Sequence, residues 1–94
     1  MESIRPIADF FHAIHNDGRI GPVHIGLYAA LLQYWQTSGF KNPISAYSYQ
    51  IMAVARISAG NTYYKLMKDL HDFGYIRYEP SFKRNQPSKV HLFI

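Results

Sequence analysis

The chain has 94 residues, of which 48% are hydrophobic and 16% aromatic, so its composition excludes a disordered polypeptide and fits one small folded domain. It contains no cysteine, which excludes a disulfide framework and a cysteine-based metal site. The longest apolar run, residues 25–35, is shorter than the roughly 20 residues of a membrane-spanning helix, and the N-terminus lacks a signal-peptide pattern. We therefore expect a cytoplasmic protein without a membrane partner.

The formal net charge of +4 is distributed unevenly along the chain. Residues 1–55 carry equal numbers of basic (Lys, Arg) and acidic (Asp, Glu) side chains, whereas residues 56–94 carry seven basic and three acidic ones. This asymmetry indicates a C-terminal part that faces a polyanion, for which nucleic acid is the most common candidate.

The first predicted element is an amphipathic helix within residues 1–18, with Ser3 as a candidate cap. Its apolar side chains recur at spacings of three and four residues: Ile4, Ile7, Phe10, Phe11 and Ile14. This stripe has two interpretations. The helix packs on its own domain, or it pairs with a second copy of the chain in a homodimer.

A second helix is predicted from Pro22 to about residue 37, where the sequence "TSGF" ends it. Its expected buried side consists of Val23, Leu27, Ala30, Leu31, Tyr34 and Trp35. The sequence "NPIS" then predicts a short extended segment, and a short helix follows over residues 47–55. The expected inner face of that helix is Tyr47, Ile51, Val54 and Ala55.

A longer helix is predicted over residues 59–73, with Ser58 as its N-cap and Gly74 in the left-handed conformation at its C-terminal end. The alternating sequences "YIRYE" and "KVHLFI" then predict two strands of a hairpin, with Ile76, Tyr78, Val90 and Leu92 inward. This order of elements predicts an α+β fold of the winged helix-turn-helix kind. The chain is one domain, in which residues 1–18 form an additional N-terminal helix and residues 22–94 form the winged-helix core with a C-terminal hairpin.

The helix predicted over residues 59–73 has one apolar stripe, formed by Tyr63, Leu66, Met67, Leu70 and Phe73. Polar and basic side chains occupy its other side, and its acidic residues lie toward the C-terminal end. The N-terminal end of a recognition helix contacts DNA bases and phosphates. We therefore predict DNA contacts from Ser58, Asn61, Thr62, Tyr64, Lys65 and Lys68. The alternative is an ordinary solvated helix face.

The hairpin loop "FKRNQPSK" is basic and polar, as a wing that grips the DNA backbone or a minor groove requires. We predict that residues 83–89 form this wing and that its DNA-binding side chains are Lys83, Arg84, Asn85 and Lys89. The alternative is a basic hairpin tip that only increases solubility.

The sequence "ISAGNTYYKLMKDLHDFGYI", followed by "YEPSFKRNQPSKVHLF", resembles the winged-helix domains of small bacterial mobile-element proteins and of plasmid- or phage-type replication proteins. It is also similar to transcriptional regulators of the multiple-antibiotic-resistance type. The resemblance covers residues 22–94 and implies a recognition helix within residues 58–68 and a wing at residues 83–89. Ala59 and Gly60 stand where such proteins often carry Lys or Arg.

These observations predict sequence-directed binding of double-stranded DNA without catalysis or a cofactor, in transcriptional or replication and mobility control of a bacterial genetic element. The alternative is a winged-helix adaptor that binds a protein and not DNA. His12 and His15 are spaced like metal ligands but lack a third ligand, so we expect no metal site. Exposed tyrosines can stack on unpaired bases, and Tyr49 and Tyr64 are the candidates for this, although most tyrosines are expected in the core.

Overall fold

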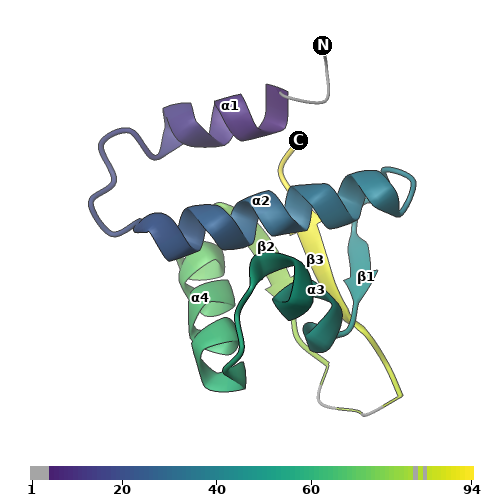
Figure 1. Ribbon diagram of the computed structural model, residues 1–94. Coiled ribbons are helices and arrows are strands. Elements are labelled where there is room, and N and C mark those ends of the chain that lie inside the picture. The colour runs from purple at the N-terminus through teal and green to yellow at the C-terminus, as the bar shows by residue number, and fades with distance from the viewer. Residues whose placement is uncertain (1–4, 82, 84) are drawn as a thin grey trace.

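The computed structural model describes residues 5–81, 83 and 85–94. These residues form four helices and one antiparallel sheet of three strands, which confirms the α+β class (Figure 1). The elements in chain order are α1 (Arg5–Ala13), α2 (Pro22–Thr37), β1 (Ile44–Ala46), α3 (Ser48–Ala55), α4 (Gly60–Asp72), β2 (Ile76–Glu79) and β3 (Ser88–Leu92). The predicted order of the elements is therefore confirmed.

The sheet has the strand order β1-β3-β2, so the last strand of the chain lies in the middle. Its register places Val90 opposite Ile44 on β1 and opposite Tyr78 on β2. In the hairpin, Ile76, Val90 and Leu92 are buried as the alternation predicted, and Tyr78 is partly buried; Ile44 on β1 is buried as well. Asn42 extends the pairing on β1, because its side-chain amide donates to Leu92 O at 2.7 Å and its Oδ1 accepts from Leu92 N at 2.9 Å.

Helix α2 lies at the centre of the fold, with α1 along one side and α3 and α4 on the other (Figure 1). Its apolar side chains are therefore spread around the helix instead of forming one narrow stripe. The largest fully buried side chains come from the helices and all three strands: Leu27, Leu31, Ile44, Ile51, Tyr63, Met67, Leu70, Ile76 and Val90.

Helix α1 packs on its own chain through Phe10, which is 3% exposed. The Phe10 ring stacks on Tyr28 of α2 at a centroid distance of 3.9 Å and meets Tyr75 edge-on at 5.5 Å. Phe11, the next residue, is 50% exposed. Ile7 and Ile14 also pack against the core, so three of the five predicted stripe residues have intrachain partners, while Ser3 and Ile4 lie outside the described residues.

Three predictions about the faces and ends of the helices are wrong. Val23 is 52% exposed because His24 is the residue in the first turn of α2 that faces α4. Val54 is 43% exposed because the inner face of α3 is formed by Ile51 with Met52 and Ala55. Ser58 is not the N-cap of α4. Ala59 holds that position with an extended backbone and no side-chain cap bond.

The C-terminal end of α4 follows the prediction. Gly74 has φ of +87°, a left-handed conformation that glycine adopts without the cost imposed by a Cβ atom. The N–H of Tyr75 then donates to Leu70 O at 2.9 Å, which closes the last turn and directs the chain into β2.

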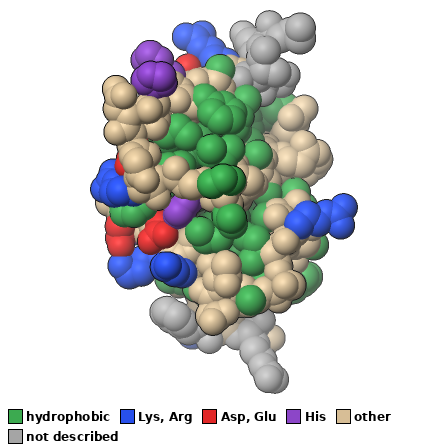
Figure 2. Space-filling model, turned by 60° about the vertical axis from the view of Figure 1, so that its left-hand side comes forward, with side chains coloured by type: hydrophobic (Ala, Val, Ile, Leu, Met, Phe, Trp, Pro, Cys, Tyr) green, Lys and Arg blue, Asp and Glu red, His purple; other side chains and the backbone are tan. Residues whose placement is uncertain are grey.

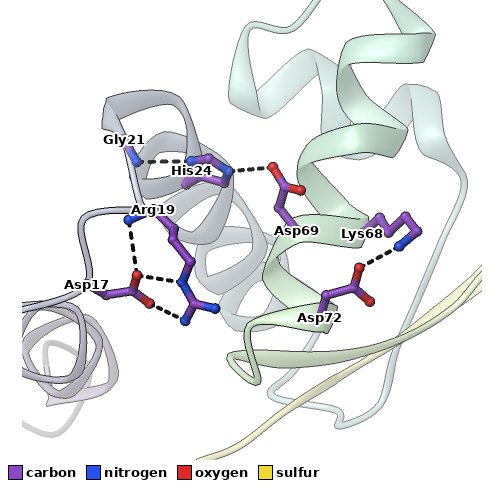
Figure 3. A network of polar contacts seen from close by, with 7 residues as sticks. All are labelled: Asp17, Arg19, Gly21, His24, Lys68, Asp69 and Asp72. Atoms are coloured by element: carbon purple, nitrogen blue, oxygen red, sulfur yellow. Dashed lines mark hydrogen bonds and ion pairs between the residues drawn. The ribbon is translucent and has the colours of Figure 1, made fainter.

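A polar network connects the α1–α2 loop, α2 and α4 (Figure 3). The Nδ1 atom of His24 accepts from Gly21 N–H at 3.0 Å, so its Nε2 carries the proton that it donates to Asp69 Oδ2 at 2.9 Å. In the loop, Asp17 accepts two hydrogen bonds from the Arg19 side chain, each at 2.8 Å. The Arg19 guanidinium also lies 4.0 Å from the centre of the Phe73 ring, a cation–π contact.

In the described part of the chain, no helix has both the length and the apolar character needed to cross a lipid bilayer.

Candidate functional site

The solvent-facing side of α4 carries the side chains that the sequence predicted there. Asn61, Thr62, Tyr64 and Lys65 are all exposed, and Tyr64 is 48% exposed. The Oδ1 atom of Asn61 accepts from Thr62 N–H at 2.9 Å, so this side chain supports the first turn of the helix. Ser58 is exposed in the turn before the helix. The N-terminal half of α4 therefore offers an amide, a hydroxyl, a phenol and an ammonium group to solvent.

The charged side chains in the C-terminal half of α4 all have hydrogen-bond or ion-pair partners within the chain. Lys68 forms an ion pair with Asp72 one turn later, and the Asp72 carboxylate raises the pKa of Lys68. Asp69 is paired with His24 of α2. Among the described residues, no ion pair involves Lys65. Lys65 is thus the lysine of α4 whose charge is directed to solvent.

Figure 2 shows the same mixture of charges on one face of the molecule. Acidic side chains lie there among Lys, Arg and His side chains, and hydrophobic side chains run through the middle of the view. This face is therefore not a uniformly basic surface. The sequence-based prediction of a polyanion-binding surface concerned α4 and the loop between β2 and β3 in particular.

The β2–β3 loop comprises residues 80–87, and its base is closed by Ser81 N–H, which donates to Ser88 Oγ at 3.0 Å. Lys83 and Asn85 are exposed in this loop. Lys89 belongs to β3, which begins at Ser88, so the predicted loop ends two residues too late. The predicted contact Arg84 lies outside the described residues.

Lys89 lies across from Glu79 in the strand pairing. The pKa of the Glu79 carboxyl is lowered, first by a hydrogen bond from His91 and then by the charges of Arg77 and Lys89. Part of the positive charge of the hairpin is thus balanced at its base. The positive charge of Lys83 lies farther out, beyond the end of β2.

A groove of about 490 Å³ lies between the start of α3, the middle of α4 and the β2–β3 loop. We name it the tyrosine groove because three tyrosines line it together with polar and basic side chains: Tyr47, Tyr49, Tyr64, Lys83 and Gln86. None of the described residues that line it is acidic. Tyr64 and Lys83 come from the two predicted DNA-binding segments, so the structure brings these segments together around one concave surface.

Tyr47 connects α3 to the loop. Its hydroxyl donates to the carbonyl oxygen of Asn85 at 3.3 Å, and its ring stacks on that of Tyr49 with a centroid distance of 5.7 Å. The groove wall thus includes Tyr47, Ser48 and Gln86, which were not predicted as site residues. The signal of Tyr47 and Ser48 in the sequence is the "YSY" repeat at the start of a predicted helix, and Gln86 belongs to the polar loop predicted as the wing. Lys68 and Lys89 do not line the groove.

In the described chain, no three His, Asp or Glu side chains are grouped in a way that could hold a metal ion. Comparisons of the chain with known protein families, with curated proteins and with solved structures found no significant match, so its function must be argued from its own geometry.

Proposed function

We propose that the chain is a winged helix-turn-helix domain that binds double-stranded DNA, with α4 as the recognition helix and the β2–β3 loop as the wing. The observation that carries this proposal is that Tyr64 of α4 and Lys83 of the loop line one groove. A single partner can therefore touch the helix and the loop at the same time. The element order from α2 to β3, with β3 in the middle of the sheet, supports the proposal because it places the hairpin beside α4.

The proposed base contacts lie in the N-terminal half of α4. Asn side chains pair with adenine edges and Lys side chains with guanine edges in the major groove, which assigns these roles to Asn61 and Lys65. Thr62 and Tyr64 are placed for phosphate or thymine-methyl contacts. The positive end of the helix dipole lies in the same half and favours phosphate there.

The proposal gives Lys68 a smaller role than Lys65. Lys68 is held by Asp72, and DNA would have to compete with that carboxylate for its ammonium group. The loop contributes Lys83 and Asn85 to the DNA backbone. The biological role, which rests on the resemblance of the sequence, is transcriptional or replication and mobility control of a bacterial genetic element. The proposal includes no catalysis and no cofactor.

The test is fluorescence anisotropy with a labelled random-sequence duplex at several salt concentrations. The wild-type chain should bind with a steep salt dependence, because each neutralised phosphate contributes about 0.9 to the slope of log K against log salt. The double variant Lys65→Ala/Lys83→Ala should reduce that slope by about two units. The control Arg5→Ala/Lys41→Ala removes the same amount of charge from exposed residues of other elements.

An equal loss of slope in both double variants would mean that the duplex is held only by the overall charge. Absence of binding at low salt would remove the duplex proposal and favour a protein-binding adaptor. One observation favours that second candidate. Phe11 and Val23 on α1 and α2 are each about half exposed, and hydrophobic side chains gather on the face shown in Figure 2.

A further inference from the structure

Two of the aromatic rings that line the tyrosine groove lie outside the hydrophobic core. Tyr49 is 66% exposed and Tyr64 is 48% exposed, and neither belongs to the buried cluster. Tyr64 meets the buried Tyr63 edge-on at a centroid distance of 5.2 Å, so its position is supported from behind. Two phenol rings on α3 and α4 thus border one hollow without being required to close the hydrophobic core.

The wall of the groove at α3 is held in place by hydrogen bonds at both ends of Tyr47. The N–H of Tyr47 donates to Gln50 Oε1 at 2.8 Å, and its hydroxyl reaches the loop carbonyl of Asn85. The Tyr47 and Tyr49 rings are nearly parallel, with an angle of 10° between their planes. A ring that is already ordered loses little conformational freedom when a ligand binds, so this pair is suited to stacking.

We propose that the tyrosine groove binds single-stranded nucleic acid by stacking an unpaired base on Tyr49, the more exposed of the two rings, while Lys83 neutralises a neighbouring phosphate. A volume of about 490 Å³ lies within the range of roughly 300–1,000 Å³ that ligand sites occupy. Stacking requires an open face of a base, which a duplex covers with the neighbouring base pairs and a single strand exposes. This inference goes beyond the duplex proposal and does not depend on it.

The chemistry of the lining favours nucleic acid over the other ligand that aromatic grooves commonly bind, a proline-rich peptide. A peptide of that kind needs aromatic slots but no phosphate-neutralising charge. The groove combines its tyrosines with Lys83, the amide of Gln86 and serine hydroxyls, and its described lining has no carboxylate to repel a phosphate. Aromatic faces with interspersed cations are the combination that binds single strands without strict sequence preference.

The experiment is an anisotropy titration of fluorescein-labelled oligothymidylate and oligouridylate with the wild-type chain and three variants. Tyr49→Leu should weaken binding by about 5- to 150-fold, the range expected for the loss of one stacked base. Tyr49→Phe keeps the ring and should retain the wild-type affinity. The control Phe93→Leu removes a similarly exposed ring at the C-terminal end of the chain, outside the groove, and should change nothing.

The two oligonucleotides distinguish the two nucleic acids that could supply an unpaired base and a phosphate, single-stranded DNA and single-stranded RNA. Tighter binding of one identifies DNA or RNA as the ligand, and either result supports the proposal if Tyr49→Leu weakens it. The proposal is overturned if neither oligonucleotide binds, if Tyr49→Leu and Phe93→Leu weaken binding equally, or if only a proline-rich peptide probe binds. The labelled duplex is titrated in parallel. Intact duplex binding without single-strand binding overturns this inference alone.

Discussion

The substitution Phe10→Ala should detach α1 from the rest of the fold. Removing a buried phenylalanine side chain costs about 3–5 kcal/mol of unfolding free energy, and Phe10 is 3% exposed between Tyr28 and Tyr75. It is also the only buried residue among those described in α1. The variant can therefore release the helix instead of keeping a cavity, which limits the loss to the free energy of docking α1. We expect the lower end of the range, about 3 kcal/mol.

This loss is large for a domain of this size. At about 4–8 °C per kcal/mol, the thermal midpoint should fall by about 12–24 °C. Guanidinium denaturation followed by circular dichroism should show a lower midpoint. It should also show a smaller m-value, because a chain with α1 already released exposes less new surface on unfolding. A change in midpoint alone would mean that α1 stays docked around a cavity.

Phe11→Ala is the matched control, since it makes the same chemical change one residue along the same helix. Phe11 is half exposed, so its loss should cost less than about 1 kcal/mol. Both variants are measured at several protein concentrations. Equal effects of the two substitutions would refute the packing argument. If the wild-type midpoint instead rises with protein concentration, and this dependence disappears in Phe11→Ala, the helix belongs to a homodimer interface.

Two further predictions concern single residues. Gly74→Ala should destabilise the fold by about 1–2 kcal/mol, because Gly74 has φ of +87°. Gly26→Ala within α2 should stabilise the fold by about 0.5–1 kcal/mol, since no atom lies within 4 Å of the added Cβ. Thermal denaturation checks both, and the same sign for both would contradict the backbone argument. Hydrogen bonds from Arg19 and Tyr75 hold the pKa of Asp17 well below its ordinary value of 3.8. The ionised Asp17 carboxylate therefore stabilises the fold fully above about pH 3.8, and this stabilisation decreases as the pH falls toward the lowered pKa. Asp17→Asn should therefore lower the thermal midpoint at pH 7 and approach the wild type in acid. A difference that stays constant over this pH range would exclude that origin.

The order of the elements could be predicted because local signals specify it. Gly74 ends α4, the alternation from Ile76 and from Val90 marks the strands, and the spacing of Leu66, Met67 and Leu70 marks the buried face of α4. These signals depend on side chains only a few residues apart. They place the ends of the elements within one or two residues of the structure.

Which apolar residue of a helix is buried could not be predicted equally well. Helix α2 is covered from two sides, so a single stripe describes it poorly, and the polar His24 takes a part-buried position next to the exposed Val23. The error at Val54 has the same origin, because the tertiary packing of α3 buries part of Met52 instead, beside the predicted Ile51 and Ala55. A periodicity ranks the faces of a helix but does not identify its neighbours.

The candidate site likewise has features that the sequence predicts and one feature that it does not. The polar face of α4 and the basic loop follow from the sequence, because their residues are contiguous or one helical turn apart. The contact of Tyr47 with Asn85 joins residues separated by 38 positions, and no local pattern indicates it. The tyrosine groove therefore emerges only from the fold, although the "YSY" sequence contains two of its rings.

The formal charges of α4 balance, because two lysines stand against two aspartates, but they are unevenly placed along the helix. Asp69 and Asp72 both lie in its C-terminal half, and each carboxylate is occupied within the chain, by His24 and by Lys68. Lys65 lies one turn closer to the N-terminus, where the helix dipole adds to its charge. An anion near Lys65 therefore meets an ammonium group without an ion-pair partner among the described residues, while farther along the helix the Asp72 carboxylate is paired with Lys68 and the Asp69 carboxylate accepts a hydrogen bond from His24. For the proposed contact with DNA, the position of the charges on α4 thus matters more than their sum.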